Sequence, residues 1–140
     1  MDVKKLLLPV DGSEYSLKAA RYGMELAKLV GASIVLLHCH KVVPPSRGRP
    51  NWEVARDALV AEAEEVLAPF EQMLEAEGIA HETRIFGGPT AEVIFDTAEV
   101  EKVDMIVMGT RGKSELSGLL VGSVTHKILH IAPCPVLVIR

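Results

Sequence analysis

The loop between residues 109 and 122 contains four glycines, Gly109, Gly112, Gly118 and Gly122, and ends in a Gly-Ser pair that could begin a helix. Glycine has no Cβ, so backbone N–H groups beside it can approach an anion closely. A helix N-terminus adds free N–H groups and the positive end of a dipole. These residues therefore favour phosphate binding, whereas the alternative is a set of ordinary turns followed by a helix cap.

The head of this loop, GTRGKS, resembles a P-loop that is two residues too short. The Walker pattern places four residues between its first glycine and the Gly-Lys pair, and this chain has two. We therefore expect no Walker site. Instead, residues 109–112 would form one half of a phosphate cradle, and Gly122, Ser123 and Val124 at the start of the next helix would form the other.

A second group of polar residues, Asp11-Gly12-Ser13, follows the first apolar segment of the chain. A carboxylate at the carboxyl end of a strand can accept hydrogen bonds from both hydroxyls of a ribose. Asp11 is therefore a candidate ribose ligand. Its alternative role is to cap the helix that follows.

Apolar periodicity predicts that strands and helices alternate along the chain. The expected strands cover residues 3–10, 32–39, 80–86, 104–108 and 136–139, and the expected helices cover residues 16–30, 52–77, 90–102 and 123–130. With right-handed crossovers this order gives an α/β fold, a doubly wound, Rossmann-like, five-stranded parallel sheet with strand order 3-2-1-4-5 and helices on both faces. Such sheets bind ligands where the winding reverses, which would bring the loops at 11–13 and 109–112 together.

Three segments depart from this regular alternation. Residues 41–50, KVVPPSRGRP, have three prolines and no periodicity, so we expect an irregular excursion there. Pro69 should bend or split the second helix near Ala68, and Gly78 should end it. The third strand is more polar than the others, which predicts a place near an edge of the sheet.

The chain has 140 residues, of which 49% are hydrophobic, and a formal net charge of -4. This composition is typical of one globular domain, here residues 1–140. The sequence has no dense basic stripe, no apolar run long enough for a membrane helix and no signal-peptide core, so we expect a cytoplasmic protein without nucleic-acid or membrane partners. Cys39 and Cys134 lie far apart in apolar segments, which favours buried free thiols.

The pattern Gly109-x2-Gly112-x9-Gly122-Ser123, after DMIVM and before APCPVLVI, resembles the nucleotide-binding signature of the universal stress protein family. The segments KKLLLPVDGSEYSLKAARYGMELAK, ASIVLLHCH and GGPTAEVIFDTAEVEKVDMIVMGTRG are similar to the family's first strand and helix, its second strand, and its third helix with the fourth strand. The resemblance covers nearly the whole chain except residues 41–56. Members that have this signature form the ATP-binding branch of the family.

The resemblance implies a role for each matching residue. It assigns the phosphates to Gly109, Gly112, Gly122, Ser123 and Val124, the ribose to Asp11, and the surroundings of the base and sugar to Pro9, Val10, Cys39 (chiefly through its backbone) and Met108. The last four residues could also be plain core. The resemblance further implies a homodimer joined through the last strand, Val136 to Ile139, and the apolar edge of this short strand favours pairing with a second copy.

Three more polar side chains lie near the head of the glycine-rich loop. Arg111 and Lys113 could reach the terminal phosphates, and Ser114 could meet a phosphate or its Mg²⁺, or all three could be solvated. Mg²⁺ would arrive with ATP, because the loop has no carboxylate-rich cage. We identify no general base near a γ-phosphate, so any ATP hydrolysis should be slow.

The histidines, and the residues that follow the third strand, bear on three other hypotheses: a metal site, a phosphoacceptor site and an adenine pocket. His126 and His130 are four residues apart, but no H-E-x-x-H pattern supports a metal site. A phosphoacceptor domain would need a further aspartate after the third strand, where this chain has Phe-Gly-Gly. One of His38 and His40 could line an adenine pocket, or both could be strand-end histidines bonded to the protein itself.

The function favoured by these residues is binding of ATP, or of another adenine nucleotide, by a stress-response regulatory or signalling module. Its protein partner is unknown. The alternative is a nucleotide-independent dimeric adaptor or scaffold of the same fold, which would use the final strand for pairing and the excursion for partners.

Overall fold

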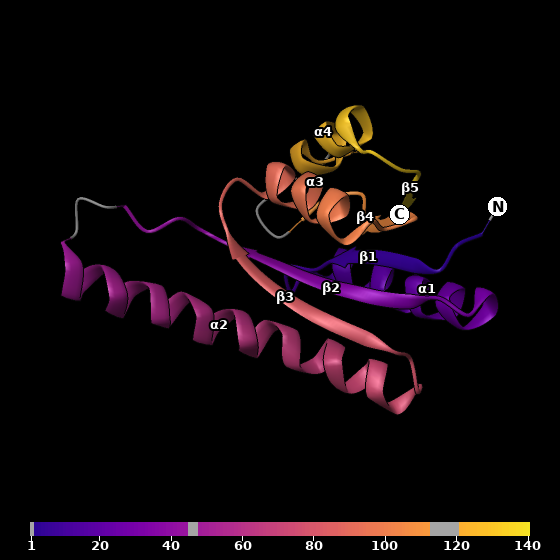
Figure 1. The fold of residues 1–140 in the computed structure, drawn as a ribbon, viewed down its shortest axis with the longest axis horizontal. Helices are drawn as coiled ribbons and strands as arrows, with labels where there is room; N and C mark the ends of the chain where they lie inside the picture. Colours follow the sequence, from indigo (N-terminus) through magenta and orange to yellow (C-terminus); the bar gives the residue numbers. More distant parts are fainter. Residues whose placement is uncertain (1, 45–47, 113–120) are drawn as a thin grey trace.

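The computed structural model describes residues 2–44, 48–112 and 121–140. Within these ranges strands and helices alternate as expected (Figure 1). In chain order they are β1 (Lys5–Pro9), α1 (Glu14–Val30), β2 (Ser33–His40), α2 (Arg49–Ala76), β3 (His81–Gly87), α3 (Thr90–Glu101), β4 (Met105–Gly109), α4 (Ser123–Ile131) and β5 (Val136–Ile139). All the strand pairs are parallel, in the order β3-β2-β1-β4-β5. The predicted fold class and strand order are therefore confirmed.

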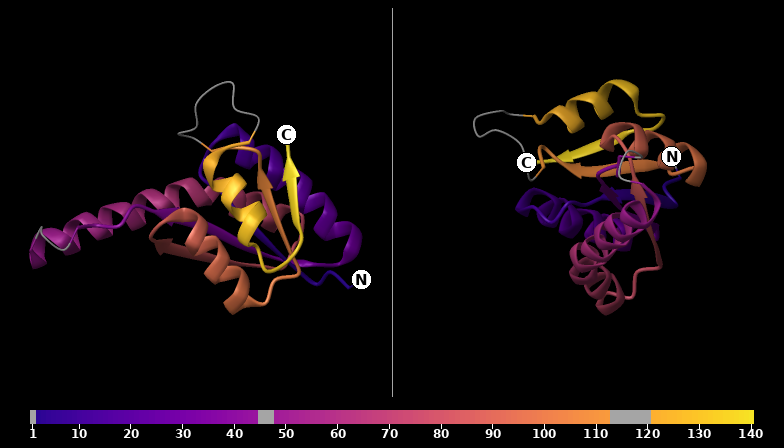
Figure 2. Two further views of the ribbon diagram at one scale, coloured as in Figure 1. Left: turned by 90° about the horizontal axis from the view of Figure 1, so that it is seen from above. Right: turned by 90° about the vertical axis from the view of Figure 1, so that its left-hand side faces the viewer.

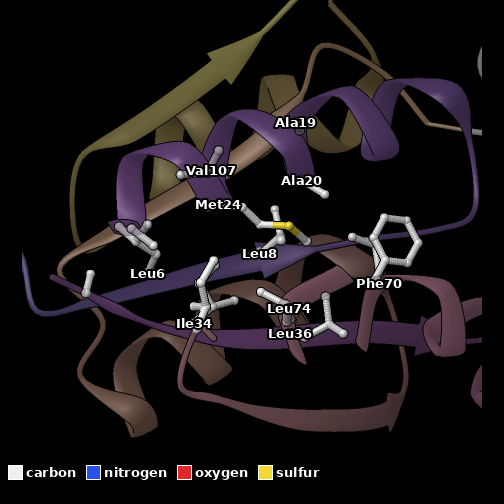
Figure 3. Packing of buried hydrophobic residues seen from close by; sticks show 14 of the residues in the cluster. Leu6, Leu8, Ala19, Ala20, Met24, Ile34, Leu36, Phe70, Leu74 and Val107 are labelled. Atoms are coloured by element: carbon white, nitrogen blue, oxygen red, sulfur yellow. The ribbon is translucent and has the colours of Figure 1, made fainter. Parts of the chain in front are cut away.

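Different helices cover the two faces of the sheet. α1 and α2 lie on one face, and α3 and α4 lie on the other (Figure 2, right). Successive strand residues point to opposite faces, so Leu6 and Leu8 belong to the core under α1 and α2, whereas Leu7 belongs to the core under α3 and α4. Figure 3 shows the first core, where Met24 of α1 and Phe70 of α2 meet the strand residues. Burial on both faces explains why these strands are continuous apolar runs.

The winding of the sheet reverses between β1 and β4. The chain moves from β1 through β2 to β3 in one direction, then crosses to β4 and continues to β5 in the other. The loops that follow β1 and β4 therefore leave neighbouring strands toward opposite faces, which opens a crevice between them. Ser13 fixes the first of these loops, because its Oγ accepts a hydrogen bond from the Ser16 N–H at 3.2 Å and caps α1.

The second helix differs from the sequence prediction at its start and in its middle. α2 begins at Arg49 rather than Trp52, so the irregular excursion ends before Arg49. It is therefore shorter than the predicted residues 41–50, and much of the 41–56 stretch that lies outside the family resemblance is helical. Pro50 lies in the first turn of α2, where a backbone N–H would have no partner within the helix, so the missing N–H of proline costs nothing there. The helix also continues through Pro69, so the predicted split does not occur. Residues on both sides of Pro69 are buried against the sheet, which offsets the lost hydrogen bond; they are Ala63, Leu67, Phe70 and Leu74.

The end of α2 and the position of β3 agree with the sequence. Gly78 takes a φ of +67° just after the helix, and the Ile79 N–H donates to the Leu74 carbonyl at 3.0 Å, which closes the last turn. β3 forms one edge of the sheet, as its polarity predicts. Arg84 on this strand pairs with Glu82 and Glu101. No helix in the described part of the chain is long and apolar enough to cross a membrane.

Candidate functional site

A cleft of about 390 Å³ lies at the carboxyl ends of β1, β2 and β4, at the reversal of the winding. The structure brings together nine of the predicted site residues in its lining: Pro9, Val10, Asp11, Cys39, Met108, Gly109, Arg111, Gly112 and Val124. These residues come from the ends of three strands, from the loops after β1 and β4, and from α4. Their meeting depends on the strand order, because β1 lies between β2 and β4.

The remaining predicted residues do not line this cleft or cannot be placed. Gly122 is buried at the N-cap of α4, and its N–H donates to the Thr110 carbonyl at 2.6 Å. Ser123 is the first residue of α4 and is exposed. Lys113 and Ser114, like Gly118, lie outside the described residues. Among the described residues, a phosphate at the β4 end of the cleft would therefore contact chiefly residues 109–112, at the head of the glycine-rich loop, and Val124.

Asp11 orders the turn before α1 and also lines the cleft. Its Oδ1 accepts a hydrogen bond from the Ser13 N–H at 2.9 Å, which orders the turn before α1. Its Oδ2 lies toward Gly112, where a built Cβ would come within 2.5 Å of that oxygen. The carboxylate thus supports the start of α1 and also lines the cleft.

Gly109 is needed for packing whether or not a ligand binds. A Cβ at this position would lie 2.9 Å from both the Cβ and the carbonyl oxygen of Tyr15. The Gly109 carbonyl accepts a hydrogen bond from the buried Thr125 Oγ1 at 2.9 Å. Gly109 therefore joins β4 to the first turn of α1 and to α4, a close approach that the sequence alone did not indicate.

Arg111 brings a cation to the β4 end of the cleft. Its guanidinium carbon lies 5.1 Å from the centre of the Tyr15 ring, within the range of a cation–π contact. Its Nε is buried and has no hydrogen-bond partner among the described residues. Buried polar atoms are nearly always paired, so this donor marks a place where an acceptor would be stabilised.

The opposite end of the cleft is formed by β2, the loop after β3 and α3. Burial raises the pKa of the Cys39 thiol from its ordinary 9.0 to about 12, so this group is neutral and acts as an apolar wall. His40 lines the cleft. His38, in contrast, donates from Nδ1 to the Val10 carbonyl at 2.8 Å and is not among the lining residues. One of the two histidines considered from the sequence is thus at the site.

Sequence reasoning missed several lining residues, namely Ser16, Leu37, Lys41, Gly88, Thr90, Ile94 and Thr125. Four of these lie just after β2 or β3 or early in α3. The predicted strand order places the carboxyl end of β3 at the same edge as the other loops, so the Gly87-Gly88 turn was a signal that could have been used. No three His, Cys, Asp or Glu side chains gather into a metal-binding group in the described ranges.

Comparison with known proteins shows which family the chain is related to. A sequence profile of the universal stress protein family matches residues 2–140. The chain belongs to the universal stress protein family. A universal stress protein of Methanocaldococcus jannaschii is 37% identical over 98% of this chain and 82% of its own length. Another, from Thermus aquaticus, is 36% identical over 98% of both chains.

Solved structures of universal stress proteins share the fold. One from Lactobacillus plantarum has a TM-score of 0.89 at 26% identity, with 100% of this chain and 99% of the other covered. A universal stress protein from Archaeoglobus fulgidus in complex with dAMP has a TM-score of 0.74 at 22% identity and full coverage of both chains (100%). One from Arabidopsis thaliana with AMP bound has a TM-score of 0.70 at 19% identity, covering 97% and 90%.

Proposed function

We propose that this universal stress protein binds an adenine nucleotide, ATP above all, in the cleft at the carboxyl ends of β4, β1 and β2. The observation that supports the proposal is the order of chemical groups along the sheet. Arg111 and Gly112 follow β4, Asp11 follows β1, and Cys39 lies near the end of β2. A nucleotide would then place its phosphates, ribose and base over three successive strands.

The spacing of the strands fits this placement. Neighbouring strands lie roughly 4.8 Å apart, so the ends of β4 and β2 are separated by about 10 Å across β1. This is comparable to the length of a nucleotide from phosphate to base. The cleft of about 390 Å³ is also in the range of small-molecule sites.

Charge and hydrogen bonding support one orientation of the nucleotide. The Nε of Arg111, which has no partner among the residues that the structure describes, would donate to a phosphate. Charge-assisted hydrogen bonds of this kind contribute roughly 1.5 to 3 kcal/mol. Asp11 would accept from the ribose hydroxyls. The neutral Cys39 and Ile94 would flank the base at the other end. The complexes of family members with dAMP and with AMP agree with an adenine nucleotide as ligand.

We extend the proposal to Mg²⁺ bound with ATP. The described lining has one carboxylate, Asp11, and near it the hydroxyls of Ser16 and Thr125. Mg²⁺ is usually held by one or two carboxylates and by the phosphates of its nucleotide, so this set of donors fits an ion that arrives with ATP. The ion would offset the negative charge of the phosphates near the Asp11 carboxylate.

At the level of the whole chain, we propose a single cytoplasmic domain, residues 1–140, that acts in stress-response regulation or signalling and forms a homodimer through β5. β5 is an edge strand of the described sheet, and its neighbour on the other side is β4. An edge strand offers unpaired backbone groups to a second copy. The protein that responds to the bound nucleotide would contact this assembly.

Nucleotide release and thermal stabilisation together test the binding proposal. Protein purified without added nucleotide is heat-denatured, and the supernatant is analysed for ATP, ADP and AMP. Apo protein is then titrated with ATP and Mg²⁺ by calorimetry and in a thermal unfolding assay, where ligand at 100 times its Kd should stabilise the fold by about 2.7 kcal/mol. Absence of released nucleotide, of binding heat and of any shift in Tm would refute nucleotide binding and favour the adaptor.

A further inference from the structure

The Gly109 carbonyl lies where the hydrogen-bond ladder between β4 and β1 stops. Backbone groups alternate along a strand, and the Thr110 N–H donates to β5, so the N–H and carbonyl of Gly109 face the side of β1. β1 ends at Pro9, however, and the Asp11 N–H beyond it donates to the Ser16 Oγ at 3.4 Å. The Gly109 carbonyl therefore takes its hydrogen bond from outside the sheet.

Thr125, in the first turn of α4, supplies the donor. Its Oγ1 donates to the Gly109 carbonyl at 2.9 Å, the residue is only 2% exposed, and both residues line the cleft. A second hydrogen bond, from the Gly122 N–H to the Thr110 carbonyl at 2.6 Å, joins the same two elements. Two hydrogen bonds thus hold the start of α4 against the end of β4.

The Thr125 hydroxyl also changes the charge that β4 presents to the cleft. A carbonyl oxygen is an acceptor with a partial negative charge, and the phosphates of the proposed ligand are anions. A buried oxygen at Gly109 without its donor would be costly, and it would repel a phosphate beside it. The hydroxyl proton offsets this charge. The first turn of α4, with Val124 in the lining, adds the positive end of the helix dipole.

We propose that Thr125 is a positioning residue for the phosphates of the bound nucleotide: its hydroxyl occupies the Gly109 carbonyl and holds the first turn of α4 against the end of β4. Thr125 acts through these two elements and does not itself need to touch the ligand. The proposal rests on the proposed nucleotide site. It adds to that site a residue that the glycine-rich pattern of the sequence does not include.

Adenosine, AMP and ATP, which share base and ribose but differ in phosphate, test the proposal by calorimetry. Thr125→Val keeps nearly the shape of threonine but removes the donor, so the Gly109 carbonyl loses its partner. We expect this variant to bind AMP and ATP roughly tenfold more weakly than the wild type, as the loss of one hydrogen bond would give, with adenosine affinity unchanged. Thr125→Ser restores a hydroxyl and should return both affinities toward the wild-type values.

Thr97→Val is a matched control. Thr97 is also buried, at 5% exposed, and its Oγ1 also donates to a backbone carbonyl, that of Val93 at 2.7 Å. This bond lies within α3, and Thr97 is not among the residues that line the cleft. The control variant should bind all three ligands like the wild type. Thermal unfolding of each protein without ligand measures what each substitution costs the fold.

A second pair of variants makes the test independent of how well Thr125→Val folds. Thr125→Ser and Thr125→Ala differ only in the hydroxyl, so their ratio of affinities isolates its effect. We expect Thr125→Ala to bind AMP and ATP more weakly than Thr125→Ser, and adenosine equally well.

The outcomes separate this inference from the proposed function. If removal of the hydroxyl weakens adenosine, AMP and ATP by the same factor, Thr125 only supports the fold and the inference is wrong. Unchanged affinity for AMP and ATP would also overturn it. If the wild type binds none of the three ligands, the proposed function fails, and the inference fails with it. A loss confined to the phosphorylated ligands, reversed in Thr125→Ser and absent in Thr97→Val, would support the assignment.

Discussion

The carboxylate of Asp11 lies so close to the backbone of Gly112 that a Cβ at position 112 would come within 2.5 Å of Asp11 Oδ2. The two residues follow β1 and β4, strands that are distant in sequence but adjacent in the sheet. The same carboxylate accepts the Ser13 N–H through Oδ1. The Asp11 side chain therefore orders the turn before α1 and occupies space beside the loop after β4 that a side chain at position 112 would fill.

Replacing Gly112 with alanine should weaken nucleotide binding with little change in the fold. The added Cβ would push the Asp11 carboxylate away from its place in the cleft, and we expect roughly a tenfold loss in ATP affinity, as for one misplaced hydrogen-bonding group. Calorimetry measures the affinity, and thermal unfolding of the apo protein measures the stability. Gly23→Ala is the control, because a Cβ there meets Val107 at an ordinary 3.5 Å. Wild-type affinity in Gly112→Ala would contradict the role given to Asp11.

Replacing Arg111 with methionine should remove affinity for phosphate but not for the nucleoside. Methionine can still pack against Tyr15 but has no charge, so ATP binding should weaken by about 1.5 to 3 kcal/mol, whereas adenosine binding should change little. The salt dependence of ATP binding should also decrease. Arg56→Met provides the control, since Arg56 lies 5.8 Å over the Trp52 ring and outside the cleft lining. Equal losses for ATP and adenosine would argue that Arg111 acts only by packing.

The buried thiol of Cys39 should make the protein less stable at alkaline pH. Its pKa is raised from 9.0 to about 12 in the folded chain, so between these values the unfolded chain has lost a proton that the folded chain keeps. The contribution of the neutral Cys39 thiol to the free energy of unfolding is complete below pH 9. It is lost as the pH rises toward 12, by up to about 1.4 kcal/mol per pH unit. Urea unfolding of wild type and Cys39→Ala at pH 8, 9 and 10 measures the difference in slope.

The second cysteine serves as an internal control for this measurement. Burial, with the negative charges of Asp104 and Glu99, also raises the pKa of the Cys134 thiol, and this residue is unchanged in Cys39→Ala. The variant should therefore retain part of the alkaline destabilisation. Identical pH dependence in the two proteins would show that the Cys39 thiol does not differ between folded and unfolded chains.

A proline at Val138 should separate dimerisation from folding. The Pro135 and Ile139 carbonyls accept from Ile106 and Thr110 of the β4 side, so the alternation of backbone groups directs the Val138 N–H to the outer edge of β5. Val138→Pro removes this outward donor while leaving the β4 ladder in place. Light scattering should give a dimer for the wild type and a monomer for the variant, with similar far-UV circular dichroism. A dimeric variant would refute pairing through β5.

Most of the fold could be predicted from local patterns because the strands are buried on both faces. The continuous apolar runs at β1, β2 and β4, and the glycines that end α1 and α2, are visible in the sequence itself. Pro69 shows where such reasoning fails. Local preference indicated a break, but burial of neighbouring α2 residues on the sheet stabilises the continuous helix.

Residue types and spacing by themselves determined the alternation of strands and helices, the edge position of β3 and the two loops that meet at the reversal of the winding. Only the tertiary structure decided which side chains share the cleft. It places Gly88 and Thr90 in the same cleft lining as Cys39 and directs the Gly122 N–H to the Thr110 carbonyl. It also brings Gly109 so close to Tyr15 that a side chain at position 109 would clash. These relations join segments far apart in the chain, and such distances depend on the packing of helices on the sheet, which no local pattern encodes.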